Sequence, residues 1–437
     1  MPAFGVYIHF PYCAQRCPYC DFAIAVRRTI RHDRYLAAIR AELAHKASLY
    51  AGRQALSVYF GGGTPSLWRP DCLASALHAA LAQFPPPAGH TPEVTVECDP
   101  AELSARTAGE AARQHLSALL AAGVNRLSLG AQSFSPAQLA ALGRRHQPED
   151  IVAAVAAARA AGFSNLSLDL MIGLPQQSLA ELNADLDALL ALAPEHVSLY
   201  LLTVEPRTPL AAAIARGAAP GVDPERQAQA YEHVRARLGD AGFHHYEISN
   251  FARRVPGHDY ASVHNRLYWT GGEYLGLGVG AHSFRRQPAA PGEHPAGTGQ
   301  RFANLRGIDP YLSVWDARGV DSAPSPRRSA LPLAPADTPS TAVGSHGQID
   351  DHPLPGLALF EDRDGDSLTR EAMWLSLRRI DGISKAAFQA EYGIDPHQAF
   401  ADEIADGRRR GLLAPDEPIR LSPAGLLYAD EVGASFL

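Results

Sequence analysis

The first half of the chain alternates short β-rich runs with longer stretches rich in alanine and leucine, and no other feature constrains the fold as much. Six strands are predicted, at Val6–Phe10, Ser57–Gly61, Glu93–Cys98, Arg126–Leu129, Asn165–Met171 and His196–Leu202. Helices are predicted between them, at Asp33–Tyr50, Asp71–Gln83, Gly109–Ala122, Pro136–Leu142, Glu149–Ala161 and Leu179–Leu192. This alternation indicates βαβ units with a parallel sheet. Because about six units are too few to close an eightfold barrel, we predict an α/β fold with a partial, open parallel β/α barrel.

Polar or glycine-rich segments follow four of the predicted strands. They are Gly61–Thr64, Asp99–Pro100, Gln132–Ser133 and Gly173–Pro175. In parallel α/β architectures, ligand chemistry collects at the carboxyl ends of the strands. We therefore expect these segments to face one common cavity.

Charge and composition argue against several classes of function. The formal net charge of -7 over 437 residues argues against a nucleic-acid partner, because phosphate binding needs a basic surface. No apolar run is long enough to span a membrane, and the N-terminus does not resemble a secretory signal. We expect a cytoplasmic protein; a peripheral association with a membrane stays open.

The chain divides into three parts by composition. Residues 1–284 are assigned to the barrel, 285–366 to Pro/Ala-rich insertions and 367–437 to a small C-terminal domain, mostly helical and winged-helix-like. Within the insertions, Gln287–Gly299 and Ser322–Gln348 are predicted to have little regular structure, whereas Arg301–Trp315 is more apolar and is expected to pack. The C-terminal domain is acidic overall, so a packing or docking role is favoured over DNA binding.

Three of the five cysteines, Cys13, Cys17 and Cys20, lie within eight positions of one another. Such a cluster in a reducing compartment indicates a metal site. Closed zinc sites need four protein ligands, whereas no fourth Cys or His follows at ligand spacing. Three thiolates suit a [4Fe-4S] cluster with one open iron. A zinc site with a distant fourth ligand, or three unrelated thiols, remain the alternatives; the isolated Cys72 and Cys98 are expected to be buried apolar residues.

An open iron of this kind can be chelated by the amino and carboxylate groups of S-adenosylmethionine (SAM). Electron transfer into the sulfonium then breaks a C–S bond and gives a 5′-deoxyadenosyl radical. Tyr19 lies between the second and third cysteines. Its ring is a candidate to lie against the adenine, with a core aromatic as the alternative.

Two segments resemble the radical SAM superfamily, and within it the HemN/HemW group of oxygen-independent coproporphyrinogen oxidases and their haem-chaperone relatives. Tyr7–Cys13 is similar to the opening of that group, and Phe60–Ser66 to its glycine motif. The resemblance implies that Tyr7, and Gly62, Gly63 and Thr64 near the SAM methionyl group, belong to the cofactor site. From the residues alone, three glycines let a backbone approach a ligand closely, or simply turn the chain.

The resemblance also implies four further SAM contacts, which are Glu97, Gln132, Arg144 and Asp169. It implies that Asp169 holds the ribose hydroxyls. Taken singly, a charged residue at a strand end is often only solvated. The order and spacing of the four together favour the cofactor site.

Two features favour the haem-chaperone branch over the oxidase. The oxidases have a further cysteine two positions after the third, where this chain has Phe22, and an extension ahead of the cluster, whereas Cys13 lies near the start here. The segment His264–Trp269 is similar to the HNxxYW motif of the chaperone branch, which implies haem contacts by His264, Tyr268 and Trp269. Imidazole is a suitable axial ligand for haem iron and aromatic rings pack on porphyrin faces, although the same residues also suit a buried turn.

The resemblance therefore implies a haem chaperone that binds a [4Fe-4S] cluster, SAM and haem and delivers haem to respiratory haemoproteins, with an electron donor for the cluster. No catalytic residue is assigned. The alternative is an oxygen-independent coproporphyrinogen III oxidase that decarboxylates propionate side chains. A radical SAM enzyme for an unrelated substrate is a third hypothesis.

Overall fold

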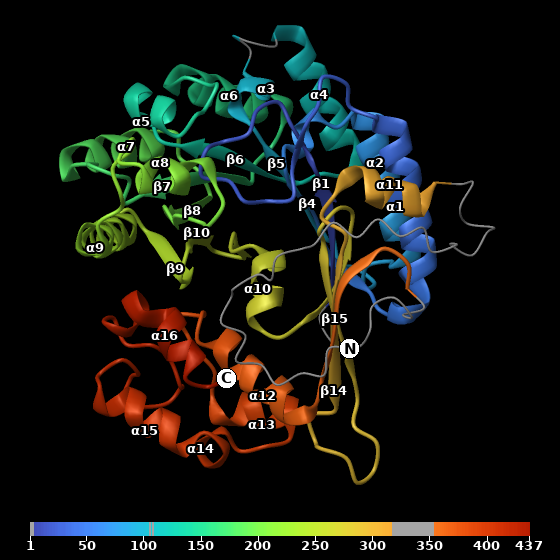
Figure 1. Cartoon of the computed structure of the whole chain (residues 1–437), viewed down its shortest axis with the longest axis vertical. Coiled ribbons are helices and arrows are strands. Elements are labelled where there is room, and N and C mark those ends of the chain that lie inside the picture. The colour runs from blue at the N-terminus through green and yellow to red at the C-terminus, as the bar shows by residue number, and fades with distance from the viewer. Residues whose placement is uncertain (1–3, 105, 107–108, 317–353) are drawn as a thin grey trace. The chain divides into compact units, whose positions relative to one another are not determined.

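The computed structural model describes residues 4–104, 106, 109–316 and 354–437 and divides into two compact units (Figure 1). The first unit comprises Ala3–His32 and Arg53–Leu267, and the second comprises Asp33–Gly52 and Tyr268–Leu437. None of the described helices is both long and apolar enough to cross a membrane.

The first unit is built on a parallel sheet that confirms the predicted α/β fold. Its six parallel strands are paired in chain order: β1 (Phe4–Phe10), β4 (Ala55–Gly62), β5 (Glu93–Cys98), β6 (Arg126–Gln132), β7 (Leu166–Ile172) and β8 (His196–Leu201). These strands are apolar on both faces, as parallel strands covered by helices are. No pairing between β1 and β8 closes the circle among the described residues, so the barrel is open.

Antiparallel strands extend this sheet beyond β8. Strand β10 (Asn250–Val255) pairs with β8, with β9 (Phe243–Glu247) and with β11 (His258–Asp259). The short pair β2 (Tyr12–Cys13) and β3 (Ala25–Val26) brackets the cysteine loop. Neither addition was predicted, because these strands are short and their pairing with distant segments leaves little trace in the local pattern.

In the first unit, these helices lie close to the predicted positions: α2 (Pro70–Gln83), α4 (Gly109–Ala122), α5 (Pro136–Ala141), α6 (Pro148–Ala161) and α7 (Leu179–Ala191). The unit also contains the 3₁₀ turn η2 (Pro65–Leu67) and helices that were not predicted, which are α3 (Pro100–Leu103), α8 (Pro209–Ala215), α9 (Pro224–Asp240) and α10 (Val263–Trp269). Local chemistry sets their ends: Ser178 and Glu181 form a capping box at α7, and Gly162 ends α6 in the left-handed conformation.

The second unit contains an antiparallel sheet of β12 (Glu273–Leu277), β13 (His282–Gln287), β14 (Thr298–Asn304) and β15 (Leu357–Arg363). The predicted irregular segment Gln287–Gly299 is a loop only over residues 288–297, because its ends belong to β13 and β14. Arg301–Trp315 packs as expected, through β14 and α11 (Ile308–Trp315). The other predicted insertion, Ser322–Gln348, lies outside the described residues.

The remainder of the second unit is helical. An N-terminal helix, α1 (His32–Lys46), continues into η1 (Ala47–Tyr50). The C-terminal region contains α12 (Gly365–Ser376), α13 (Lys385–Tyr392), α14 (Pro396–Ala399), α15 (Ala401–Arg409), η4 (Gly425–Tyr428) and α16 (Ala429–Ala434). Two isolated bridges, Ile383 with Ile419 and Leu413 with Leu421, give the predicted hairpin-like stretch its antiparallel partners.

Candidate cluster and cofactor site

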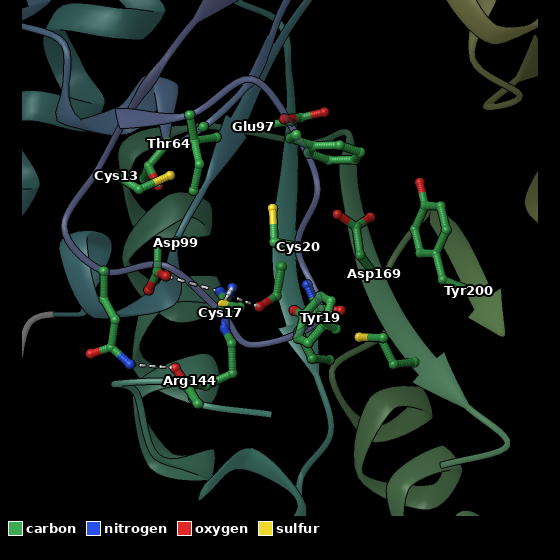
Figure 2. A pocket seen from close by; sticks show the side chains of 18 of the residues that line it. Cys13, Cys17, Tyr19, Cys20, Thr64, Glu97, Asp99, Arg144, Asp169 and Tyr200 are labelled. Carbon is green, nitrogen blue, oxygen red and sulfur yellow. Dashed lines mark hydrogen bonds and ion pairs between the residues drawn. The ribbon is translucent and has the colours of Figure 1, made fainter. Parts of the chain in front are cut away.

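A cavity of about 490 Å³ opens at the carboxyl ends of the parallel strands of the first unit (Figure 2). Its wall includes eleven of the predicted site residues: Cys13, Cys17, Tyr19, Cys20, Gly62, Gly63, Thr64, Glu97, Gln132, Arg144 and Asp169. Residues from three of the four predicted strand-end segments therefore share this cavity. Gly173–Pro175 is not part of the described wall.

The three cysteines are half-buried free thiols on one loop after β1. The loop is folded by a turn in which the amide of Cys20 donates to the carbonyl of Cys17 over 3.2 Å. Thr64 Oγ1 lies 3.6 Å from the Cys13 sulfur, and Arg144 Nη1 lies 3.7 Å from the Cys17 sulfur. Two hydrogen-bond donors thus point at the sulfurs from other elements, and such donors stabilise thiolate ligands.

The donor set fits an iron–sulfur cluster. Three soft thiols border one side of a cavity, and each ligand of a four-iron cluster binds a different iron. Among the described residues, no three His, Cys, Asp or Glu side chains converge as a single metal ion requires. Burial raises the pKa of Cys13 to about 11, and the neighbouring Cys20 and Cys17 add to that shift. Cluster binding would therefore release a proton from this thiol.

Arg144 is fixed in place by the end of β5. Its guanidinium Nη2 donates to Asp99 Oδ2 over 2.9 Å and to the carbonyl of Gly130 over 3.2 Å. Burial opposes ionisation of Asp99, but the nearby His146 and the charge of Arg144 outweigh it and lower its pKa to about 2. Asp99 is thus a fixed anion that aims Arg144 at Cys17, a role that the sequence did not reveal.

Glu97 and Asp169 are two carboxyl groups on the cavity wall. Glu97 accepts hydrogen bonds from the Tyr59 hydroxyl and from the amide of Gly62, both over 2.9 Å. Burial and the charge of Asp169 raise the pKa of Glu97 to about 7. Asp169 accepts from the Ser128 hydroxyl over 2.9 Å, and burial raises its pKa to about 6. Two partly buried carboxyl groups with raised pKa values at one cavity are typical of a ligand site.

The glycine segment passes close beneath the cysteine loop. The amide of Gly63 donates to the carbonyl of Phe10 over 2.8 Å, and a Cβ at Gly63 would lie 2.7 Å from the carbonyl oxygen of Tyr12. At Gly62 the backbone has φ +110°, and a Cβ there would lie 2.3 Å from the His9 ring. The close approach explains why side chains are excluded at both positions.

Gln132 occupies a strained position at the end of β6. Its φ of 66° is rare for a residue with a side chain, and the pairing of β6 with β7 is irregular between Leu129 and Gln132. Strain of this kind costs about 1–3 kcal/mol and collects at binding sites. The distortion directs Gln132 into the cavity wall. The sequence pattern alone does not predict this distortion.

Tyr7, which is partly buried, and His264, which is buried, lie outside the described wall of this cavity. His264 is 2% exposed, and its Nδ1 lies 2.8 Å from the Ser57 hydroxyl. Its ring stacks on Tyr59 at a centroid distance of 5.0 Å and lies 6.4 Å from the ring of Tyr7. Burial and the charge of Arg126 lower the pKa of His264 to about 3, so its imidazole is neutral.

Tyr268 and Trp269 border a smaller cavity of about 210 Å³ within the second unit. Its wall also includes Tyr274, Phe284 and the ion pair of Arg301 with Glu371. The indole Nε1 of Trp269 is buried and has no hydrogen-bond partner among the described residues. The described wall of this cavity includes Tyr268 and Trp269 of the three predicted haem contacts.

Sequence reasoning missed several residues of the main cavity. The wall also includes Ser128, Met171 and Tyr200, and Phe22, which is 60% exposed at the cysteine loop. No motif marks Ser128, Met171 and Tyr200, which lie within predicted strands; Phe22 was noted only as the position that lacks a further cysteine. Cys72 and Cys98 are buried, as expected for small apolar residues.

Comparisons with known proteins agree with this arrangement. The model of the Radical SAM superfamily matches residues 7–189, and that of the HemN C-terminal domain matches residues 364–428. The structure of coproporphyrinogen III oxidase (HemN) from Escherichia coli, a radical SAM enzyme, superposes with a TM-score of 0.71 at 22% identity, over 100% of this chain and 90% of that one. At this identity the match establishes the fold alone.

Relatives of known name identify the branch of the radical SAM superfamily. Heme chaperone HemW from Bacillus subtilis is 31% identical over 99% of both chains, and that from Synechocystis is 40% identical over 98% of this chain and 95% of the relative. The mitochondrial radical S-adenosyl methionine domain-containing protein 1 of Bos taurus is 39% identical, over 70% of this chain but only 65% of the relative. The chain therefore belongs to the HemW family of the radical SAM superfamily.

Proposed function

We propose that this protein is a haem chaperone with a radical SAM core, which binds a [4Fe-4S] cluster, SAM and haem and transfers haem to respiratory haemoproteins. The observation that carries the proposal is the single cavity that holds three thiols together with the glycine segment and the polar ends of β5, β6 and β7. The name of the full-length relatives supports the haem part. We place the protein in the cytoplasm, with transfer at a membrane surface and a separate electron donor for the cluster.

In this proposal Cys13, Cys17 and Cys20 hold the cluster. When bound, the cluster supplies an open iron for SAM and an electron for its sulfonium. Arg144 and Thr64 donate toward two of the sulfurs, which lowers the electron density on these ligands. Gly62 and Gly63 admit the methionyl part of SAM close to the backbone, and Asp169 accepts from the ribose hydroxyls. Tyr19 lies beside the adenine.

Haem binding is assigned to α10. His264 is neutral, as an axial ligand must be, but its ring is only 2% exposed and must be uncovered before an iron can reach it. The unpartnered Nε1 of Trp269 can donate to a propionate, and Tyr268 supplies an apolar face. Haem binding here therefore requires α10 to shift from the packing that the structure shows.

A haem titration of the anaerobically reconstituted protein tests this assignment. We expect His264→Ala and Trp269→Ala each to weaken haem binding by about tenfold or more, because an axial bond or a propionate contact is lost. His196→Ala is the matched control, since His196 is also fully buried and also holds a serine hydroxyl at 2.8 Å from Nδ1. Equal haem affinity in all four proteins would refute the assignment to α10.

The oxidase alternative is tested on the same preparation. Coproporphyrinogen III is supplied anaerobically with SAM and a reductant, and the products are analysed. We expect no protoporphyrinogen, because Phe22 stands where the oxidases carry a further cysteine. Turnover to protoporphyrinogen would replace the chaperone proposal with the enzyme.

A further inference from the structure

Strand β5 carries a glutamate at each end, and both point to the same face because they are four residues apart. Glu93 accepts hydrogen bonds from the Ser262 hydroxyl and from the amides of Val263 and His264, each over 3.0 Å. It therefore caps the N-terminus of α10. Glu97, at the other end, accepts from the amide of Gly62 in the glycine segment. Strand β5 thus contacts both the N-terminus of α10 and the glycine segment in the wall of the main cavity.

Tyr59 joins the same two regions through side chains. Its ring stacks on His264 with an interplanar angle of 26°, and its hydroxyl donates to Glu97. Ser57, two residues earlier on β4 and so on the same face, holds His264 Nδ1. Contacts therefore run without interruption from His264 through Tyr59 and Glu97 to the backbone of Gly62.

Three side chains lie close together around Gly61 on this path. A Cβ on Gly61 would lie 2.9 Å from the Tyr59 ring, 3.0 Å from Glu97 and 3.0 Å from the Tyr7 ring. The Tyr59 ring is thus held on this side by Gly61, Glu97 and Tyr7, and on its other contact by the stacking with His264. A shift of the His264 ring, as haem ligation would require, must move Tyr59 or break its stacking.

We infer that Tyr59 is a positioning residue that couples His264 on α10 to Glu97 and the glycine segment, so that displacement of His264 changes the affinity of the main cavity for SAM. The inference deepens the proposed function, since it assumes SAM in that cavity. Coupling of this kind is reciprocal: if haem changes SAM affinity by some factor, SAM changes haem affinity by the same factor.

SAM affinity of cluster-reconstituted protein, measured by equilibrium dialysis, is the first test. We expect Tyr59→Phe, which keeps the ring and removes the hydroxyl, to weaken SAM binding by about tenfold, because Glu97 loses a hydrogen bond that supports its charge. Tyr231→Phe is the matched control, because its hydroxyl donates to the Ile248 carbonyl away from this cavity. SAM affinity in Tyr59→Phe equal to that in Tyr231→Phe would overturn the inference while leaving SAM binding established.

The pH profile separates positioning from a general loss of packing. The groups that face Glu97 are Tyr59 on β4, Arg126 on β6, Asp169 on β7 and Tyr200 on β8. The Tyr59 hydroxyl favours the ionised carboxylate, so its removal raises the pKa of Glu97. We expect SAM affinity to fall as the pH drops through about 7 in the wild type. That midpoint should lie at higher pH in Tyr59→Phe; an unshifted midpoint contradicts the role.

Amide exchange of the protein without cluster, SAM or haem tests the coupling independently of the proposed function. His264→Ala should speed exchange at the Gly62 and Gly63 amides severalfold, whereas His196→Ala should not. If the wild type binds no SAM but this difference is present, the proposed function fails and the coupling stands. If exchange at Gly62 and Gly63 is the same in both variants, the coupling is refuted.

Discussion

At Gly62 a single hydrogen in place of a side chain decides whether the cavity can form. Its φ of +110° disfavours any other residue, and the His9 ring occupies the space of a Cβ. We expect Gly62→Ala to lower the free energy of unfolding by more than the ~1 kcal/mol that a positive φ alone costs. Urea unfolding measures this. Gly89→Ala is the control, because Gly89 has φ +75° with nothing within 4 Å of its Cβ; equal losses would show that His9 yields without cost.

His264 makes stability depend on pH through its burial. Its pKa is lowered to about 3, so the folded protein binds this proton less readily than the unfolded chain, whose histidine titrates near 6.5. The stabilisation is complete above pH 6.5 and is lost as the pH falls toward 3. We expect His264→Gln to reduce the slope of unfolding free energy between pH 6 and 4 by about 1.4 kcal/mol per pH unit. An unchanged slope would show that His264 is not buried as a neutral ring.

At the scale of elements, α10 depends on a capping residue that lies far away in the sequence. Removal of the Glu93 carboxylate takes away the acceptor of the Val263 and His264 amides, at a cost of about 1–3 kcal/mol. We expect Glu93→Ala to speed amide exchange in α10 at least tenfold. Asp223→Ala removes the cap of α9 instead and should leave α10 unchanged. Exchange in α10 that is equally slow in both variants would assign its stability to packing.

At the scale of the whole molecule, each unit has its own buried polar centre. In the second unit, Lys46 pairs with Glu42 and also donates to Asn304 over 2.7 Å, with all three side chains buried. Tyr311 donates to the same glutamate over 2.5 Å. The carboxylate is thus satisfied by α1, β14 and α11, which come together only after folding.

Because each unit has its own buried polar centre, we expect SAM to slow amide exchange mainly in the unit that binds it. At a concentration a hundred times its Kd, SAM should stabilise the unit that binds it by about 2.7 kcal/mol. We expect amide exchange to slow at residues 61–64, 97–99 and 130–132 of the first unit. Helix α12 of the second unit should change little. Hydrogen-exchange mass spectrometry measures both, and equal slowing in α12 would contradict a site confined to the first unit.

The local pattern of the sequence determined the parallel part of the first unit. All six parallel strands and the major helices between them were predicted to within a few residues, because hydrophobic period, caps and glycine stops act over a few positions. Strands β12 to β15 were not predicted. These strands are antiparallel. Paired strands such as β14 and β15 are separated in the sequence by residues whose pattern does not predict the pairing.

For the candidate site too, the sequence determined one part and the tertiary structure decided the rest. Spacing alone placed Cys13, Cys17 and Cys20 on one loop, and strand order predicted the common cavity. Tertiary structure decided the partners of these residues: Arg144 reaches Cys17 across 127 positions, and Glu93 caps α10 across 170. It also decided that His264 is buried and neutral. Burial and electrostatic environment depend on neighbours that meet only in the folded chain, whereas turns, caps and ligand spacing depend on residues already adjacent in the sequence.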